Sequence, residues 1–184
     1  MQTYIHLFDE CTQNWFAVAS IIENILATLR ALKLDLSQVY LRSGNAGCYH
    51  CGYLLLSFPG IGDRTGVKIA RYDFSELQAG KDICDRRIAA VKGHMRRFLN
   101  EGNDAKTASD MKDAIESYGG IKGSYAAVCR AQASAQTMTK HTMTGVQGLH
   151  NFSYENGGMR VWRAYDIGLG KFYSEAQLAR FRTP

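Results

Sequence analysis

The apolar positions of the first 75 residues predict alternating strands and helices. Residues 3–8, TYIHLF, alternate β-branched and aromatic side chains and predict a strand that ends near Asp9. Residues 14–33 predict a long helix, because apolar side chains recur there at spacings of three and four. That stripe consists of Trp15, Val18, Ile22, Ile25, Leu26, Leu29 and Leu32. Residues 38–43 and 67–75 predict two further strands. Between them, the apolar run 53–58 fits either a helix turn or a strand, and FPGIGDRTG (58–66) predicts a loop.

The second half of the chain predicts two helices and then more strands. Residues 80–102 form an amphipathic pattern with a glycine at each end. At about 100° per residue, one arc holds Cys84, Ile88, Val91, Met95, Phe98 and Leu99, and another holds Arg86, Arg87, His94 and Arg97. Residues 107–120 predict a short helix with its N-cap at Thr107 or Ser109. Residues 124–132 predict a strand, and 150–155 and 159–168, joined through NGG, predict a β-hairpin. We expect the C-terminal tail to be loosely held. This order of elements predicts an α/β layered domain.

Composition narrows the class of protein. A chain of 184 residues with 46% hydrophobic content can bury one core. The odd number of cysteines, five, favours reduced thiols and an intracellular location, nuclear or cytoplasmic. We find no basic and apolar leader, and runs such as GYLLLSF are shorter than the roughly 18 residues that span a bilayer, so no membrane partner is expected. The net charge of +5 permits contact with nucleic acid.

The segment RSGNAGCYHC (42–51) gathers residues that can bind metal. Cys48, His50 and Cys51 offer thiolate and imidazole ligands for zinc, so a small zinc-dependent interaction module is one alternative. Their spacing is shorter than that of a standard zinc knuckle, and Cys11 and Cys84 could complete a site only by folding next to them. Buried small cysteines and an ordinary histidine are the competing interpretation.

The helix expected over 80–102 carries the other candidate residues. Asp85 lies at the margin of its apolar face and could join other carboxylates in binding a divalent cation, or could be a solvated or paired aspartate. The basic side chains of this helix could follow a phosphate backbone, or could form a solvated face. They are Arg86, Arg87, Lys92, Arg96 and Arg97. The glycine-rich GIGDRTG lacks the lysine and Ser/Thr ending of a phosphate-binding loop.

Four blocks of the chain together resemble one family. They are TYIHLFDECTQNWFAVASIIENIL, LRSGNAGCYH, RYDFSELQAGKDICDRR and VKGHMRRFLNEG. They resemble transposon-derived proteins with ribonuclease-H-like (DDE-type) integrase cores, closest to transposases of the Kyakuja-Dileera-Zisupton type. The resemblance covers roughly residues 3–165, and NAGCYH and GKDICDRR are its most specific blocks. It implies a partial ribonuclease-H-like core over 1–125, with a mixed sheet and flanking helices, and a β-rich extension with a hairpin over 126–184, packed on the same domain.

The resemblance also implies a definite chemistry. An intact family member uses three acidic residues to hold two Mg²⁺ or Mn²⁺ ions about 4 Å apart. The family has SDNAGCYH where this chain has SGNAGCYH, so Gly44 occupies an emptied ligand position, and Asp85 matches the third acid. The first acid lies upstream of TYIHLFDEC in the family, and Asp9 does not match it.

We therefore expect an N-terminally truncated, catalytically inactive transposase-derived domain with no cofactor of its own and residual DNA binding. The loss of a central first strand would also leave strand edges unpaired, through which the chain could self-associate. An active Mg²⁺-dependent nuclease or strand-transfer enzyme is a further alternative, and it requires other carboxylates to converge on Asp85.

Overall fold

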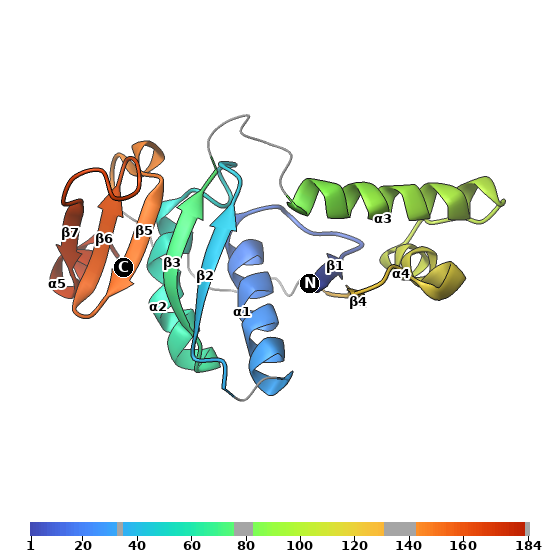
Figure 1. Cartoon of the computed structure of the whole chain (residues 1–184), viewed down its shortest axis with the longest axis horizontal. Helices are drawn as coiled ribbons and strands as arrows, with labels where there is room; N and C mark the ends of the chain where they lie inside the picture. The colour runs from blue at the N-terminus through green and yellow to red at the C-terminus, as the bar shows by residue number, and fades with distance from the viewer. Residues whose placement is uncertain (33–34, 76–82, 131–142, 183–184) are drawn as a thin grey trace. The chain divides into compact units, whose positions relative to one another are not determined.

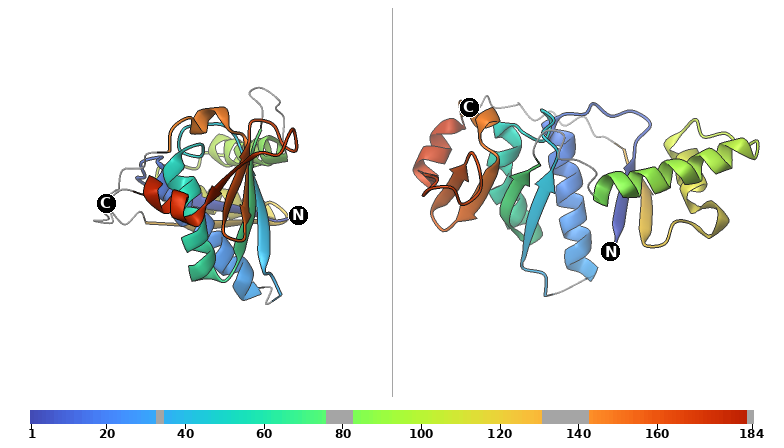
Figure 2. Two further views of the ribbon diagram at one scale, coloured as in Figure 1. Left: turned by 90° about the vertical axis from the view of Figure 1, so that its left-hand side faces the viewer. Right: turned by 45° about the horizontal axis from the view of Figure 1, so that its top comes forward.

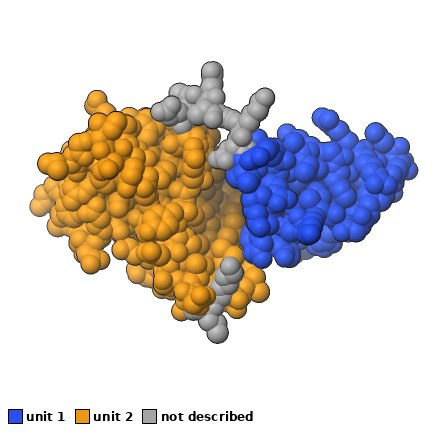
Figure 3. All heavy atoms as spheres, in the orientation of Figure 1, with its two compact units in different colours: residues 1–12, 80–134 blue, residues 13–79, 135–184 orange. Residues whose placement is uncertain are grey.

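The fold is given by a computed structural model, which describes residues 1–32, 35–75, 83–130 and 143–182. The chain divides into two compact units (Figure 3). Unit 1 comprises residues 1–12 and 80–134, and unit 2 comprises residues 13–79 and 135–184. This division does not fall at the boundary expected after residue 125.

Unit 1 is a small α/β unit. Its elements are β1 (Thr3–Leu7), α3 (Ile83–Asn100), α4 (Ala108–Glu116), the 3-10 turn η1 (Ser117–Gly119) and β4 (Ser124–Val128) (Figure 1). Strands β1 and β4 pair in parallel, from Thr3 opposite Ser124 to Leu7 opposite Val128. Helix α4 packs against both strands, and its N-cap is Thr107, whose hydroxyl accepts a hydrogen bond from the Asp110 N–H. Of the two N-cap candidates, Thr107 is confirmed.

Unit 2 contains a five-stranded mixed sheet. Its elements are α1 (Trp15–Leu32), β2 (Gln38–Ser43), α2 (Gly52–Thr65), β3 (Lys68–Phe74), the 3-10 turn η2 (Val146–Gly148), β5 (Asn151–Glu155), β6 (Gly158–Trp162), β7 (Lys171–Ser174) and α5 (Glu175–Phe181). The strand order is β2-β3-β5-β6-β7, and only the β2–β3 pair is parallel. The protein is therefore mixed α/β, and the long helix and the predicted hairpin are confirmed. The C-terminal tail was expected to be loosely held, but it forms β7 and α5.

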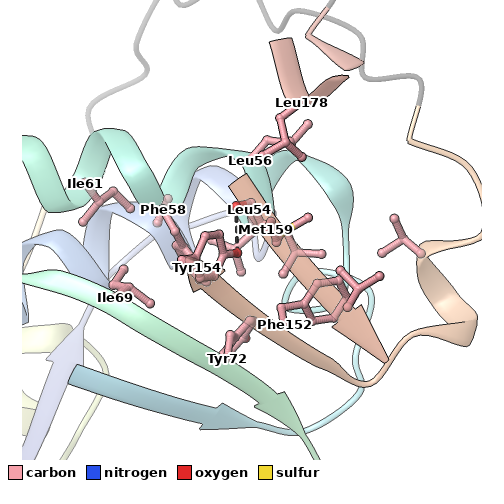
Figure 4. Close-up of a cluster of buried hydrophobic side chains, with 14 of the residues drawn as sticks. Leu54, Leu56, Phe58, Ile61, Ile69, Tyr72, Phe152, Tyr154, Met159 and Leu178 are labelled. Carbon is pink, nitrogen blue, oxygen red and sulfur yellow. Dashed lines mark hydrogen bonds between the residues drawn. The ribbon is translucent and has the colours of Figure 1, made fainter. Parts of the chain in front are cut away.

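One face of this sheet forms the core of unit 2. Helices α1, α2 and α5 lie on that face (Figure 2, left). The strands contribute Ile69, Tyr72, Phe74, Phe152, Tyr154, Met159 and Val161 to the buried cluster (Figure 4). The helices contribute Val18, Ala19, Leu26, Leu54, Leu55, Leu56, Phe58, Ile61 and Leu178. Because β5 and β6 share this core with β3, the C-terminal strands extend the same sheet.

Helix α2 corrects the sequence analysis, which predicted a loop over 58–66. The helix runs to Thr65 with Pro59 inside it, and Gly66 ends it with a left-handed φ of 68°. Proline has no N–H, so it cannot donate to the carbonyl of Leu55 four residues earlier. The buried hydroxyl of Tyr154 on β5 donates to that carbonyl instead, at 2.9 Å (Figure 4). The interior proline is tolerated because a distant strand supplies the missing donor.

Helix α1 differs from expectation in one respect. By length and composition it is apolar enough to cross a membrane, whereas the sequence analysis found no sufficiently long run. In the fold, Val18, Ala19 and Leu26 of this helix are buried in the core of unit 2, where α1 packs on α2.

The contact between Tyr154 and Leu55 predicts a non-additive pair of substitutions. We expect Tyr154→Phe to lower the free energy of unfolding by about 1–3 kcal/mol, because it leaves a buried carbonyl without a donor. In a Pro59→Ala background the backbone N–H of residue 59 can serve that carbonyl, so Tyr154→Phe should cost about 1 kcal/mol less. Urea unfolding of the four proteins measures the coupling. An equal cost in both backgrounds would contradict this role for Tyr154.

Candidate functional site

The carboxyl ends of β2 and β3 lie side by side in unit 2. The Ser43 carbonyl oxygen accepts a hydrogen bond from the Ser75 N–H at 2.9 Å, just beyond the ends of both strands. Gly44 follows Ser43 directly, and a Cβ atom built on it would meet no atom within 4 Å. The position has room for a side chain, and the chain places none there.

Asp73 is the carboxylate at the end of β3. Its Oδ2 lies 2.7 Å from Nε of Arg71, and its Oδ1 accepts from Nδ2 of Asn151 at 2.8 Å. The Arg71 guanidinium also lies 3.4 Å from the ring centroid of Tyr165. The sequence analysis did not select Asp73. The available signal was Arg71 two positions earlier, on the same face of the strand, because Asn151 is distant in sequence.

His50 is fully buried and connects this end of the sheet to the segment that precedes β5. Its Nε2 lies 2.7 Å from the Leu149 carbonyl oxygen, which can only accept, so Nε2 carries a proton. Its Nδ1 contacts the side-chain amide of Asn45, and its ring stacks on Phe74 with centroids 4.0 Å apart. Burial lowers the pKa of His50, so the ring is held neutral. In that state Nδ1 is an acceptor, and Asn45 donates to it once a half-turn of the side-chain amide exchanges Nδ2 for Oδ1, the atom that faces Nδ1 here.

Two residues of the zinc hypothesis, His50 and Cys51, are poorly disposed to bind a metal ion. Both ring nitrogens of His50 contact other groups. Burial raises the pKa of the Cys51 thiol, which disfavours the thiolate that zinc binds. Cys11 and Cys84 belong to unit 1, whereas Cys48 and Cys51 belong to unit 2. Across the described ranges, no three His, Cys, Asp or Glu side chains gather as a metal ligand set.

Helix α3 carries the remaining candidates. Asp85 is exposed in its first turn. Arg86, Lys92 and Arg96 are exposed and Arg87 is half-buried, and none of the four has an ion pair within the described residues. Arg97 differs, because its Nε lies 3.0 Å from Oε1 of Glu101 and its guanidinium lies 4.0 Å from the Tyr118 ring centroid.

The predicted apolar arc of α3 is only partly buried. Val91 is buried, and Met95 and Phe98 are half-buried. Ile88 and Leu99 remain 49% and 45% exposed, and Cys84, expected to face the core, is exposed. The helix packs on the short helix α4, which covers only part of the arc.

Gly44 belongs to unit 2 and Asp85 to unit 1. Unit 2 also contains a cavity of about 730 Å³, and neither Gly44 nor Asp85 lines it. It is lined by residues of α2, α5 and the start of β3, among them Asp63, Lys68 and Glu175. Gly44 lies at the opposite end of β3 from Lys68.

The burial of His50 predicts a pH-dependent stability. Because the pKa of His50 is lowered in the folded state, the unfolded chain binds a proton first as the pH falls below about 6.5. We expect the contribution of His50 to the free energy of unfolding to be constant above that pH and to decrease below it. Urea unfolding from pH 7.5 to 5.5 (roughly one unit on either side of the free histidine pKa) should show a shallower decline for His50→Gln than for the wild type. His94→Gln, in unit 1, is the control. Equal declines for His50→Gln and the wild type would contradict the assignment.

Comparison with protein-family models, with curated proteins and with solved structures gives no match to this chain. Its function is therefore inferred from its own residues: a glycine with room for a side chain at position 44, a paired carboxylate at Asp73, and a helix whose basic side chains Arg86, Lys92 and Arg96 have no ion pair among the described residues.

Proposed function

We propose that this chain is a transposase-derived domain that contacts DNA through α3 and does not cleave it. The observation that carries the proposal is the set of α3 cations without carboxylate partners among the described residues, Arg86, Arg87, Lys92 and Arg96. Lys92 and Arg96 lie four residues apart and so share one side of the helix. From residue 86 to residue 96 the helix rises about 15 Å, which spans more than one phosphate.

The arrangement of β2, β3 and α3 supports the transposase-derived part of the proposal. The family resemblance expects its second acid just after a strand, and its third acid on a later helix. Gly44 comes directly after β2, which pairs in parallel with β3. Asp85 lies in the first turn of α3, the next helix after β3.

The side chains around Gly44 support binding without cleavage. Two-metal hydrolysis needs several carboxylates that converge on the ions. Gly44 supplies none, and the Asp73 carboxylate is already paired with Arg71 and hydrogen-bonded to Asn151. The two carboxylates required beside Asp85 are therefore not supplied by this end of the sheet.

The binding proposal predicts a salt-dependent affinity. With about three phosphate contacts, the slope of log affinity against log salt on duplex DNA should be near −2.7, about a 40-fold loss from 50 to 200 mM salt. Fluorescence anisotropy with duplex and single-stranded DNA measures it. Replacing Arg86, Lys92 and Arg96 together with Gln should abolish most of the binding.

Arg97→Gln is the matched control on the same helix, because Glu101 and Tyr118 already engage that charge. It should leave the slope nearly unchanged. No binding even near 50 mM salt, or an equal loss in Arg97→Gln and in the triple variant, would contradict a role for the free α3 cations.

A further inference from the structure

Among the strands that the structure describes, β2 pairs only with β3 and forms one edge of the sheet in unit 2. The Ser37 carbonyl accepts from the Lys68 N–H, and the Ser43 carbonyl accepts from the Ser75 N–H, both at 2.9 Å. Backbone groups alternate in direction along a strand. The odd-numbered residues therefore point toward β3, and Gln38, Tyr40 and Arg42 direct their N–H and C=O groups away from the sheet.

This edge lacks the features that usually protect a strand from pairing. The opposite edge, β7, has four residues, begins at Lys171 and continues directly into α5. Strand β2 has six residues, no proline and a single charge, Arg42. The register shift between Val39 and Tyr40 places the extra residue on β3, so β2 itself is regular. Long, regular edges with few charges are open to pairing with another strand.

We propose that β2 pairs antiparallel with β2 of a second copy of this chain, about a two-fold axis at Tyr40. This register places Tyr40 opposite Tyr40 of the second copy, Gln38 opposite Arg42, and Val39 opposite Leu41. The three outward-pointing residues would exchange about six main-chain hydrogen bonds. The interface is isologous, so it closes at a dimer and joins two sheets into one.

The side chains of β2 are self-complementary in this register. Tyr40 is 67% exposed and would gain an aromatic partner directly across the strand pair. Val39 and Leu41, which pack against the core, would meet each other on the face that carries the helices. Arg42 faces an amide rather than a second arginine, so no like charges are opposed. A shift of one residue would turn every side chain to the wrong face.

The residues that form this pairing belong to unit 2, whereas α3, which carries the proposed DNA contact, belongs to unit 1, so the two proposals rest on different residues. Six residues form a small interface, so we expect a weak dimer that dissociates on dilution. Sedimentation velocity of the full chain without DNA, over a roughly hundredfold concentration range, should show a reversible monomer–dimer equilibrium.

Two substitutions test the edge. Tyr40→Lys opposes two positive charges at the axis and should give a monomer at every concentration. Tyr125→Lys is the matched control, since Tyr125 is also an exposed tyrosine on a strand, in unit 1. It should dimerise like the wild type. A monomeric wild type, or a dimer lost in Tyr125→Lys and kept in Tyr40→Lys, would overturn the proposal. If the wild type is monomeric, the β2 edge would be open to pairing with a strand of a different protein instead.

Cysteine substitutions test the register and do not depend on the stability of Tyr40→Lys. In the proposed pair the two residues 40 are about 5.5 Å apart at Cα, within the range of a disulfide. The two residues 38 would be separated by about 14 Å along the strands. Under mild oxidation, Tyr40→Cys should form covalent dimers above the wild-type background of exposed Cys11 and Cys84, and Gln38→Cys should not. Equal crosslinking of the two variants would contradict this register.

Discussion

The fold of unit 2 depends on a hydrogen bond that lets a proline lie inside its central helix. The Tyr154 hydroxyl serves the Leu55 carbonyl that Pro59 cannot serve, so α2 can continue to Thr65. The helix thereby buries Phe58 and Ile61, and carries the chain from the end of β2 to the start of β3. The parallel pairing of those strands in turn sets Gly44 beside the end of β3.

Local sequence patterns were sufficient to predict those helices and strands that need no partner distant in sequence to form. The alternating strands, the apolar stripe of α1 and the NGG hairpin all appear as predicted. The pattern failed at α2, because Pro59 and three nearby glycines are loop signals, and the compensating donor is Tyr154, far along the chain. It failed again at Cys84, because the short helix α4, the main neighbour of α3 among the described elements, covers only part of the apolar arc.

The candidate site residues could likewise be selected from the sequence, but their contacts could not be predicted from it. Resemblance points to Gly44, both resemblance and helical spacing point to Asp85, and helical spacing alone points to the basic residues of α3. Their engagement depends on neighbours that spacing does not reveal: Arg97 is held by Glu101 and Tyr118, while Arg86 and Lys92 have no such partner among the described residues. His50 was grouped with the cysteines as a metal ligand, yet its contacts with Asn45 and Leu149 make it part of the core.

The proposed function separates two properties that an intact member of the family it resembles would combine. Free cations on α3 can attract a phosphate backbone without any carboxylate, because that attraction depends on charge alone. Two-metal cleavage of a phosphodiester needs converging carboxylates, and Gly44 and the engaged Asp73 do not supply them. The proposed function keeps the first property and lacks the second.

The most direct test is a plasmid assay on the wild type and Gly44→Asp. The substitution has room at position 44, so the variant should fold, and it restores the acid that the family resemblance expects there. With supercoiled plasmid and Mn²⁺ at low salt, we expect both proteins to retard the plasmid and neither to nick it. Mn²⁺-dependent nicking by either protein, absent from a Gly44→Asn control, would contradict the proposal of binding without cleavage.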